Sequence, residues 1–277
     1  MVRLLQIEFI KLWNNRASKV LIISYFIILT SIALVAAIKF DIGPVKFHLA
    51  EVGIFNFPYI WHFNTFVTAF FKLFLAIVIV SMMANEYSNK TIKQNLIDGL
   101  SKKEFILSKF LTVITFSFVS TIFVFVVSLI LGLFYSDYNE ISIIFSDLEF
   151  VFAFFVKLIG FFSFCLFLGI LVKRSAFALG FLIIWQIIEG ITRGLIRWKL
   201  FDSETTETIM GFFPLQSMFN LIKEPVTRLQ AVQEVADQVG ESITLNYHVH
   251  WYEVLIVLSW TAIFIYSSYA LLKKRDL

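Results

Sequence analysis

Four charged residues lie inside long apolar runs of this chain, where a charge is costly. They are Lys72, Lys157, Glu189 and Arg193. A Lys or Arg at the centre of a membrane helix costs roughly 2.5–3.5 kcal/mol on insertion scales, so each needs a partner or a use. One interpretation is mutual neutralisation, with Glu189 paired to Lys72 or Lys157. The other makes all four a polar lining of a substrate path, in contact with an anionic or zwitterionic substrate.

The composition places these charges in an integral membrane protein. The chain has 277 residues, of which 59% are hydrophobic and only 16% charged, and its mean hydropathy is +0.84. These values lie far outside those of an ordinary soluble domain. The net charge of +3 is too small to indicate a nucleic-acid partner. The single Cys165 lies in an apolar run and excludes an intrachain disulfide.

Six apolar runs are long enough to cross a bilayer, which needs about 20 residues. They cover approximately 20–38, 65–84, 107–134, 150–171, 176–195 and 254–272. We therefore predict an all-α integral membrane protein with six transmembrane helices in a single domain, 1–277. The third run is longer than required, so it should tilt or extend beyond the membrane. In these runs all four embedded charges fall in the outer half, at comparable depth.

The segments that flank and connect the runs are alternately rich and poor in basic residues. Of the 23 Lys and Arg residues, 14 lie in four segments: the N-terminal tail, the 85–109 island, the pair after the fourth run and the C-terminal tail. The segments that alternate with these, 39–62, 135–149 and 196–253, hold six. The positive-inside rule therefore places both termini and the 85–109 island in the cytoplasm. The expected location is a cell (inner) membrane, with a bacterial source.

A polar, basic segment, 86–109, joins the second and third runs. Ser88 or Asn89 can cap a short helix over about 90–98, because their side-chain oxygens accept from free backbone N–H groups. Its apolar side would carry Ile92, Leu96 and Ile97. A short helix held between two spans is a suitable docking site for a partner protein. An ordinary capped loop on the membrane surface would have a similar sequence pattern.

Two sequence patterns define the end of this segment. Gly99 can supply the left-handed residue that ends the short helix. Ser101 and Glu104 then form a capping-box pattern that opens the next helix.

The segment resembles the coupling segment of ABC transporter permeases of the type-2 exporter class. The matching positions are Glu86, Tyr87, Thr91, Ile92, Leu96, Gly99, Ser101, Lys102, Glu104 and Lys109. The resemblance implies six spans, a dimer with a second permease (homo- or heterodimer), and a separate cytoplasmic nucleotide-binding subunit that grips the 86–101 segment. It implies no cofactor in this chain, with ATP and Mg held by the partner subunit. The residues expected to couple to that ATPase are Glu86, Lys90, Thr91, Ile92, Asn95, Leu96, Gly99, Leu100 and Ser101.

Two further segments lie outside the runs. Residues 1–19 mix basic and apolar residues, which indicates an interfacial helix or a simple positive flank. Residues 197–250 form the only sizeable external region and predict an extracytoplasmic helical cap. Within it, the apolar stretch 212–222 is too short to span, and Pro225 should open an amphipathic helix that ends at Gly240. The cap either enters the membrane in part or forms a small lid on the span ends.

Absent motifs narrow the function further. No Gly-x-x-x-x-Gly-Lys-Ser/Thr loop occurs, so this chain should not hydrolyse ATP itself, and we expect no catalytic residues. Glu189 and Arg193 stand four residues apart, as in an intramembrane protease motif, but Ile188 replaces the doubled acid. The four histidines, all expected outside, are His48, His62, His248 and His250. Surface or interface histidines explain them better than a metal site.

These observations favour the membrane-spanning permease subunit of an ATP-driven exporter, with lipid as its surroundings. A secondary transporter or channel that works without an ATPase is the alternative. A non-transporting scaffold that binds an ATPase is a third option. The sequence does not identify a substrate.

Overall fold

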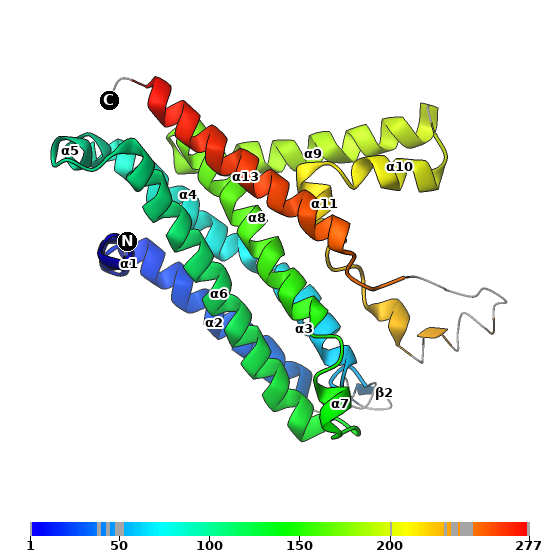
Figure 1. The fold of residues 1–277 in the computed structure, drawn as a ribbon. Helices are drawn as coiled ribbons and strands as arrows, with labels where there is room; N and C mark the ends of the chain where they lie inside the picture. Colours follow the sequence, from blue (N-terminus) through cyan, green and yellow to red (C-terminus); the bar gives the residue numbers. More distant parts are fainter. Residues whose placement is uncertain are drawn as a thin grey trace.

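The computed structural model describes residues 2–37, 40–42, 45–47, 53–199, 201–229, 232–233, 238 and 246–275. It is a helical bundle with one small hairpin, in which β1 (Phe40–Ile42) pairs antiparallel with β2 (Val45–Phe47). The helices are α1 (Val2–Asn14), α2 (Arg16–Ala37), α3 (Tyr59–Ala69), α4 (Lys72–Ser88), α5 (Thr91–Ile97), α6 (Lys102–Tyr135), α7 (Ile141–Ile144), α8 (Glu149–Val172), α9 (Ser175–Lys199), α10 (Ser203–Met210), α11 (Pro214–Asn220), the short 3-10 helix η2 (Val226–Arg228) and α13 (Trp251–Lys274) (Figure 1). The helical prediction is therefore right for the bundle and misses the hairpin.

Five described helices are long and apolar enough to cross a membrane, and a sixth crossing results if α3 and α4 count as one bent span. The longest is α6, whose 34 residues extend about 51 Å at 1.5 Å per residue. That exceeds the roughly 30 Å hydrocarbon core of a bilayer, as the long third run predicts.

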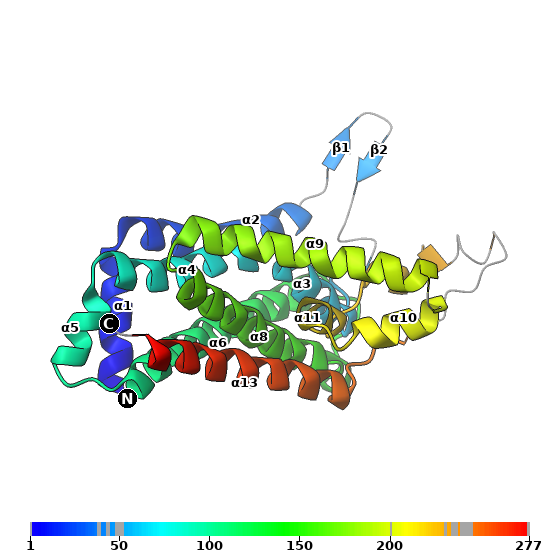
Figure 2. The same cartoon turned by 90° about the horizontal axis from the view of Figure 1, so that it is seen from above.

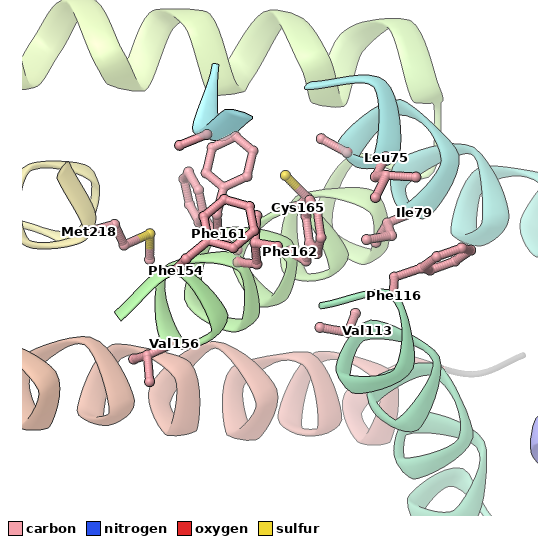
Figure 3. Close-up of a cluster of buried hydrophobic side chains, with 14 of the residues drawn as sticks. Leu75, Ile79, Val113, Phe116, Phe154, Val156, Phe161, Phe162, Cys165 and Met218 are labelled. Carbon is pink, nitrogen blue, oxygen red and sulfur yellow. The ribbon is translucent and has the colours of Figure 1, made fainter. Parts of the chain in front are cut away.

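Helix α8 is the centre of the bundle. It is apolar on every side, which is typical of a helix surrounded by others. Figure 3 shows α8 side chains, among them Phe154 and Phe162, in a buried cluster with residues of α4, α6 and α11. At Gly160 a Cβ would lie 2.7 Å from a methyl group of Val257, so the absence of a side chain permits the close approach of α13.

Helices α2 and α9 are the opposite case. Only 17% of the most apolar window of each is buried, against 78% for the segment that contains α8. Both helices therefore present long apolar surfaces to their surroundings. They lie along one face of the bundle (Figure 2).

The second apolar run is longer and less regular than predicted. It begins at Tyr59, breaks after Ala69 and bends by 46° into α4. The polar residues His62 and Asn64 lower the hydropathy of its first part, so that part is not recognised as a span. Both side chains are hydrogen-bonded inside the bundle: His62 Nε2 with Lys223 O at 2.9 Å, and Asn64 Nδ2 with Ser128 Oγ at 2.9 Å. Lys72 consequently opens α4 near the middle of the bent pair, further from the start of that pair than it is from the start of the predicted 65–84 run.

The N-terminal segment is a separate helix that lies crosswise to α2 (Figure 2). The chain turns at Asn15, whose Oδ1 accepts from Ser18 N at 3.1 Å and so caps α2. Helix α1, α5 and the end of α13 all lie at one end of the bundle (Figure 1). A crosswise helix with Trp13 exposed suits an interfacial position, which stays a prediction.

Part of the predicted cap, the region of α11, is packed into the bundle. After α9 the chain returns along it as α10 and then enters α11 (Figures 1 and 2). Trp260 Nε1 donates to Phe212 O at 2.8 Å, about 14 Å along α13 from its first residue. The region that contains α11 therefore lies beside α8 and α13 and not beyond their ends.

The amphipathic helix expected after Pro225 does not begin there, although residues 232, 233 and 238 are helical. Pro225 opens only the 3-10 turn Val226–Arg228, and Leu229 is already extended. The proline fits the start of either kind of helix, so its presence did not distinguish them. The expected end at Gly240 lies outside the described residues, as does His48.

Candidate functional site

The segment between α4 and α6 begins differently from the prediction. Helix α4 continues through Ser88, and Asn89 N donates to Asn85 O at 2.9 Å, so neither residue caps the next helix. Lys90 takes a left-handed conformation, φ +54°, and α5 starts at Thr91 without a side-chain cap. The expected nine-residue helix is thus seven residues long, because the last turn of α4 uses the polar residues that resembled its cap.

The end of α5 follows the prediction. Gly99 has φ +94°, a conformation that favours glycine, and Leu100 N donates to Asn95 O at 3.0 Å. Ser101 opens α6 with a complete capping box: Glu104 N donates to Ser101 Oγ at 3.2 Å, and Ser101 N donates to Glu104 Oε2 at 3.0 Å.

Helix α5 is divided between a fixed side and a free side. Ile92 is buried and Leu96 is partly buried against the core, whereas Ile97 is 75% exposed. Residues 92 and 97 are about 140° apart at roughly 100° per residue, so the expectation that Ile97 shares their side is wrong. The exposed residues of the segment are Ser88, Asn89, Lys90, Lys93, Gln94, Ile97, Asp98, Gly99 and Ser101, while Asn95 and Leu100 are partly buried.

A buried ion cluster anchors the fixed side. Lys109 Nζ lies 2.6 Å from Glu8 Oε2 and 2.6 Å from Glu86 Oε1, and its side chain is fully buried. Lys11 Nζ adds a second cation 3.0 Å from Glu86 Oε1, and the Thr91 hydroxyl donates to the other Glu86 oxygen. Two carboxylates therefore meet two ammonium groups, which ties α1, α4, α5 and α6 together.

The C-terminal end reinforces the same region. Arg275 donates to the Tyr87 hydroxyl at 3.0 Å and to Leu171 O at 3.0 Å, and Lys102 Nζ donates to Arg275 O at 3.0 Å. Sequence reasoning identified Glu86 and Lys109 but missed Glu8 and Arg275. The available signal was that Glu8 is the only acid in a basic, apolar N-terminal helix.

A second candidate site is a cavity of about 670 Å³ bounded by α3, α4, α8, α9 and α11. Lys72, Lys157 and Arg193 line it, so the structure brings together three of the four embedded charges. Lys72 Nζ lies 4.4 Å from the ring centre of Phe161, and Lys157 Nζ lies 5.5 Å from that of Phe219. The cavity otherwise has mainly apolar walls.

Glu189 is used elsewhere, and its expected pairing with Lys72 or Lys157 is not found. The buried carboxylate accepts from Trp185 Nε1 at 2.7 Å and from the backbone N–H groups of Leu215 at 3.1 Å and Gln216 at 2.9 Å. It therefore caps the start of α11, where Pro214 has no N–H to offer. Arg193 is bound from the other side by α10, with Nε 2.9 Å from Glu207 Oε1.

The histidines give no metal centre within the described residues, where no group of three His, Cys, Asp or Glu side chains could hold an ion. His248 Nδ1 lies 3.0 Å from Glu149 Oε1, and the His250 ring stacks on Tyr252. His62, for which a surface or interface position was expected, is buried within the bundle in α3 and stacks on Phe150 with ring centres 3.9 Å apart.

A family model described as "ABC-2 family transporter protein" matches residues 12–277, nearly the whole chain. No curated protein matches the chain significantly. This match agrees with the multi-pass helical bundle, and the chain belongs to the ABC-2 family of membrane transport proteins.

Proposed function

We propose that the chain is the membrane-spanning permease subunit of an ATP-driven exporter, worked by a separate cytoplasmic nucleotide-binding subunit. The observation that carries the proposal is the two-sided α5. One side is fixed by Glu86, Thr91 and the buried Lys109, and the other offers Ile97 as an exposed apolar contact. A helix that is free to bind on one side and rigidly attached on the other can transmit a force.

The proposed topology has six spans, with α3 and α4 as one bent crossing and both termini in the cytoplasm. Basic residues then gather on the side where α1, α5 and the end of α13 lie (Figure 1). The chain would reside in the inner membrane of a bacterium. Regions α10 and α11 would form the outer cap and enter the membrane in part.

In the proposed mechanism, the ATPase subunit docks on residues 86–101 and on α1. ATP and Mg belong to that subunit, and closure of two such subunits would push α5. The push would reach α4 through Glu86, α6 through Lys109 and α1 through Glu8. These three side chains form one continuous contact network. Helices α2, α4 and α9 would line a path between two permeases, and the large exposed surfaces of α2 and α9 suit such a pairing.

Copurification of the ATPase subunit from the native membrane in mild detergent tests the proposal. Ile97→Asp places a charge at the centre of the proposed contact and should abolish copurification of a nucleotide-binding protein. Ile141→Asp is the matched control, because Ile141 is also 75% exposed but lies in α7, near the opposite end of the bundle (Figure 1). It should leave copurification unchanged.

Neither variant should change stability by more than about 0.5 kcal/mol, since both side chains are exposed. If the unmodified chain copurifies no nucleotide-binding protein and transports without one, the chain is a secondary transporter or channel. If the ATPase binds but nothing is transported, the chain is a scaffold.

A further inference from the structure

The cavity lined by Lys72 and Lys157 differs from the ion cluster at α5, because neither of these lysines has a carboxylate partner among the described residues. Among the described residues, no Asp or Glu lies within ion-pair distance of either Nζ. Lys157 is only 2% exposed, and its Nζ donates one long hydrogen bond among the described residues, to Phe219 O at 3.5 Å. A buried ammonium with one weak acceptor is an unsatisfied group, and an anion is what would satisfy it.

The carboxylate of Glu189, the expected partner of these lysines, is not available for that task. Both oxygens of Glu189 accept hydrogen bonds, from Trp185 and from the first two N–H groups of α11. This arrangement holds α11 in place, and α11 in turn supplies Met218 and Phe219 to the cavity wall. The protein therefore uses the buried Glu189 to hold a wall beside Lys157 and leaves the lysine without a carboxylate partner.

The walls define the rest of the ligand. Apolar side chains from each bounding helix surround the cationic end, for example Phe66, Leu73, Phe161, Leu182 and Ile187. A volume of about 670 Å³ is within the range of roughly 300–1,000 Å³ typical of small-molecule sites. Arg193 lines the same cavity and adds positive charge to it, but its guanidinium is already paired with Glu207.

We propose that this cavity binds a single-chain amphiphile with one anionic headgroup, a carboxylate or a phosphate ester, placed between Lys72 and Lys157 with its chain along the apolar walls. A neutral amphiphile would leave both ammonium groups unpaired, and a cationic one would be repelled by them, so the headgroup charge sets specificity. As a transport substrate the ligand rests on the proposed exporter function, but binding itself requires no ATPase.

Binding is tested with the full chain in phosphatidylcholine nanodiscs, by the fluorescence enhancement of dansyl-labelled undecanoate. Its methyl ester and its trimethylammonium analogue carry the same chain with other headgroups. The carboxylate should bind about tenfold or more tightly than either, the difference expected for a desolvated charge pair. Equal binding of carboxylate and ester would overturn the proposal, whether or not any variant folds.

Variants locate the site. Lys72→Gln with Lys157→Gln should weaken carboxylate binding about tenfold or more and leave ester binding unchanged. Lys199→Gln removes the same charge from an exposed position at the end of α9 and should change neither. A double variant that keeps full carboxylate affinity contradicts the assignment.

Two pairs of competitors identify the source of the anionic group. Unlabelled dodecanoate and dodecyl phosphate should displace the probe, while acetate and inorganic phosphate should not. Displacement by the small anions, or by phosphatidylglycerol included in the nanodisc, would show a free-anion or bilayer-lipid site and would overturn the single-chain assignment. Loss of ATPase copurification, in contrast, would contradict the exporter function and leave this binding result intact.

Discussion

Lysines at two places in the same bundle have opposite surroundings; Lys109 and Lys157 are buried and Lys72 is partly buried. At the α5 end, Lys109 is enclosed by Glu8 and Glu86, each 2.6 Å away. In the cavity, Lys72 and Lys157 have aromatic rings and a distant carbonyl for neighbours. The same residue type is thus compensated in one place and left uncompensated in the other.

The difference teaches how to separate structural charges from functional ones. A buried charge with its full set of partners serves to join elements, here α1, α4 and α6. A buried charge without partners costs stability and persists only where something else uses it. Substitutions at the two places should therefore change stability in opposite directions.

The largest effect is expected at Lys109. Lys109→Met leaves Glu8 and Glu86 buried beside each other with only the partly exposed Lys11 to compensate. Breaking a buried pair in this way should lower the free energy of unfolding by about 3–5 kcal/mol. A denaturant titration of the purified chain in detergent measures this loss of unfolding free energy.

Partial rescue checks the cause. Adding Glu8→Gln and Glu86→Gln to Lys109→Met removes the uncompensated charges and should recover part of the loss. If Lys109→Met is as stable as Lys199→Met, in which the lysine is exposed, the cluster does not hold these helices together.

The next effect has the opposite sign. Lys157→Met replaces an unpaired, buried ammonium by an apolar side chain of similar length and should raise the free energy of unfolding by about 1–3 kcal/mol, the reverse of the insertion cost of a lysine. The same denaturant titration measures it in the absence of any amphiphile. A loss comparable to that of Lys109→Met would mean that Lys157 has a structural partner and would end the contrast between the two places.

A smaller loss is expected at Glu189, the carboxylate that neither lysine uses. Glu189→Gln keeps the shape but weakens the bonds to the N–H groups of Leu215 and Gln216. Loss of a charged helix cap should cost about 1 kcal/mol. Limited proteolysis within α11 should accelerate with it, and unchanged proteolysis would show that α11 is held by its apolar contacts alone.

Local rules in the sequence predicted the local features of the fold. The capping box at Ser101 and the left-handed Gly99 depend on residues a few positions apart, so they could be read directly. The start of α5 could not, because Ser88 fits the last turn of one helix as well as the cap of the next, and the packing of α4 decides between them.

Long-range partners were beyond the sequence for a different reason. Glu8 and Lys109 are 101 positions apart, and nothing in either neighbourhood specifies the other. Glu189 was expected to find a lysine but found backbone N–H groups 26 and 27 positions later. Side-chain chemistry predicts that a buried carboxylate needs donors, but only the fold determines which donors reach it.

The smallest predicted effect compares two glycines at which an added methyl group would meet nothing within 4 Å, Gly99 after α5 and Gly180 in α9. Gly99→Ala should lower the free energy of unfolding by about 1 kcal/mol, because φ +94° places a Cβ in a disfavoured conformation. Gly180→Ala should raise it by about 0.5–1 kcal/mol, since alanine loses less conformational freedom in a helix. Space is equal at the two sites, so a difference in sign measures backbone conformation alone. If both variants behave alike, the left-handed end of α5 is not maintained in the folded chain, and the short helix that is proposed to receive the ATPase would lose the fixed geometry on which its lever action depends.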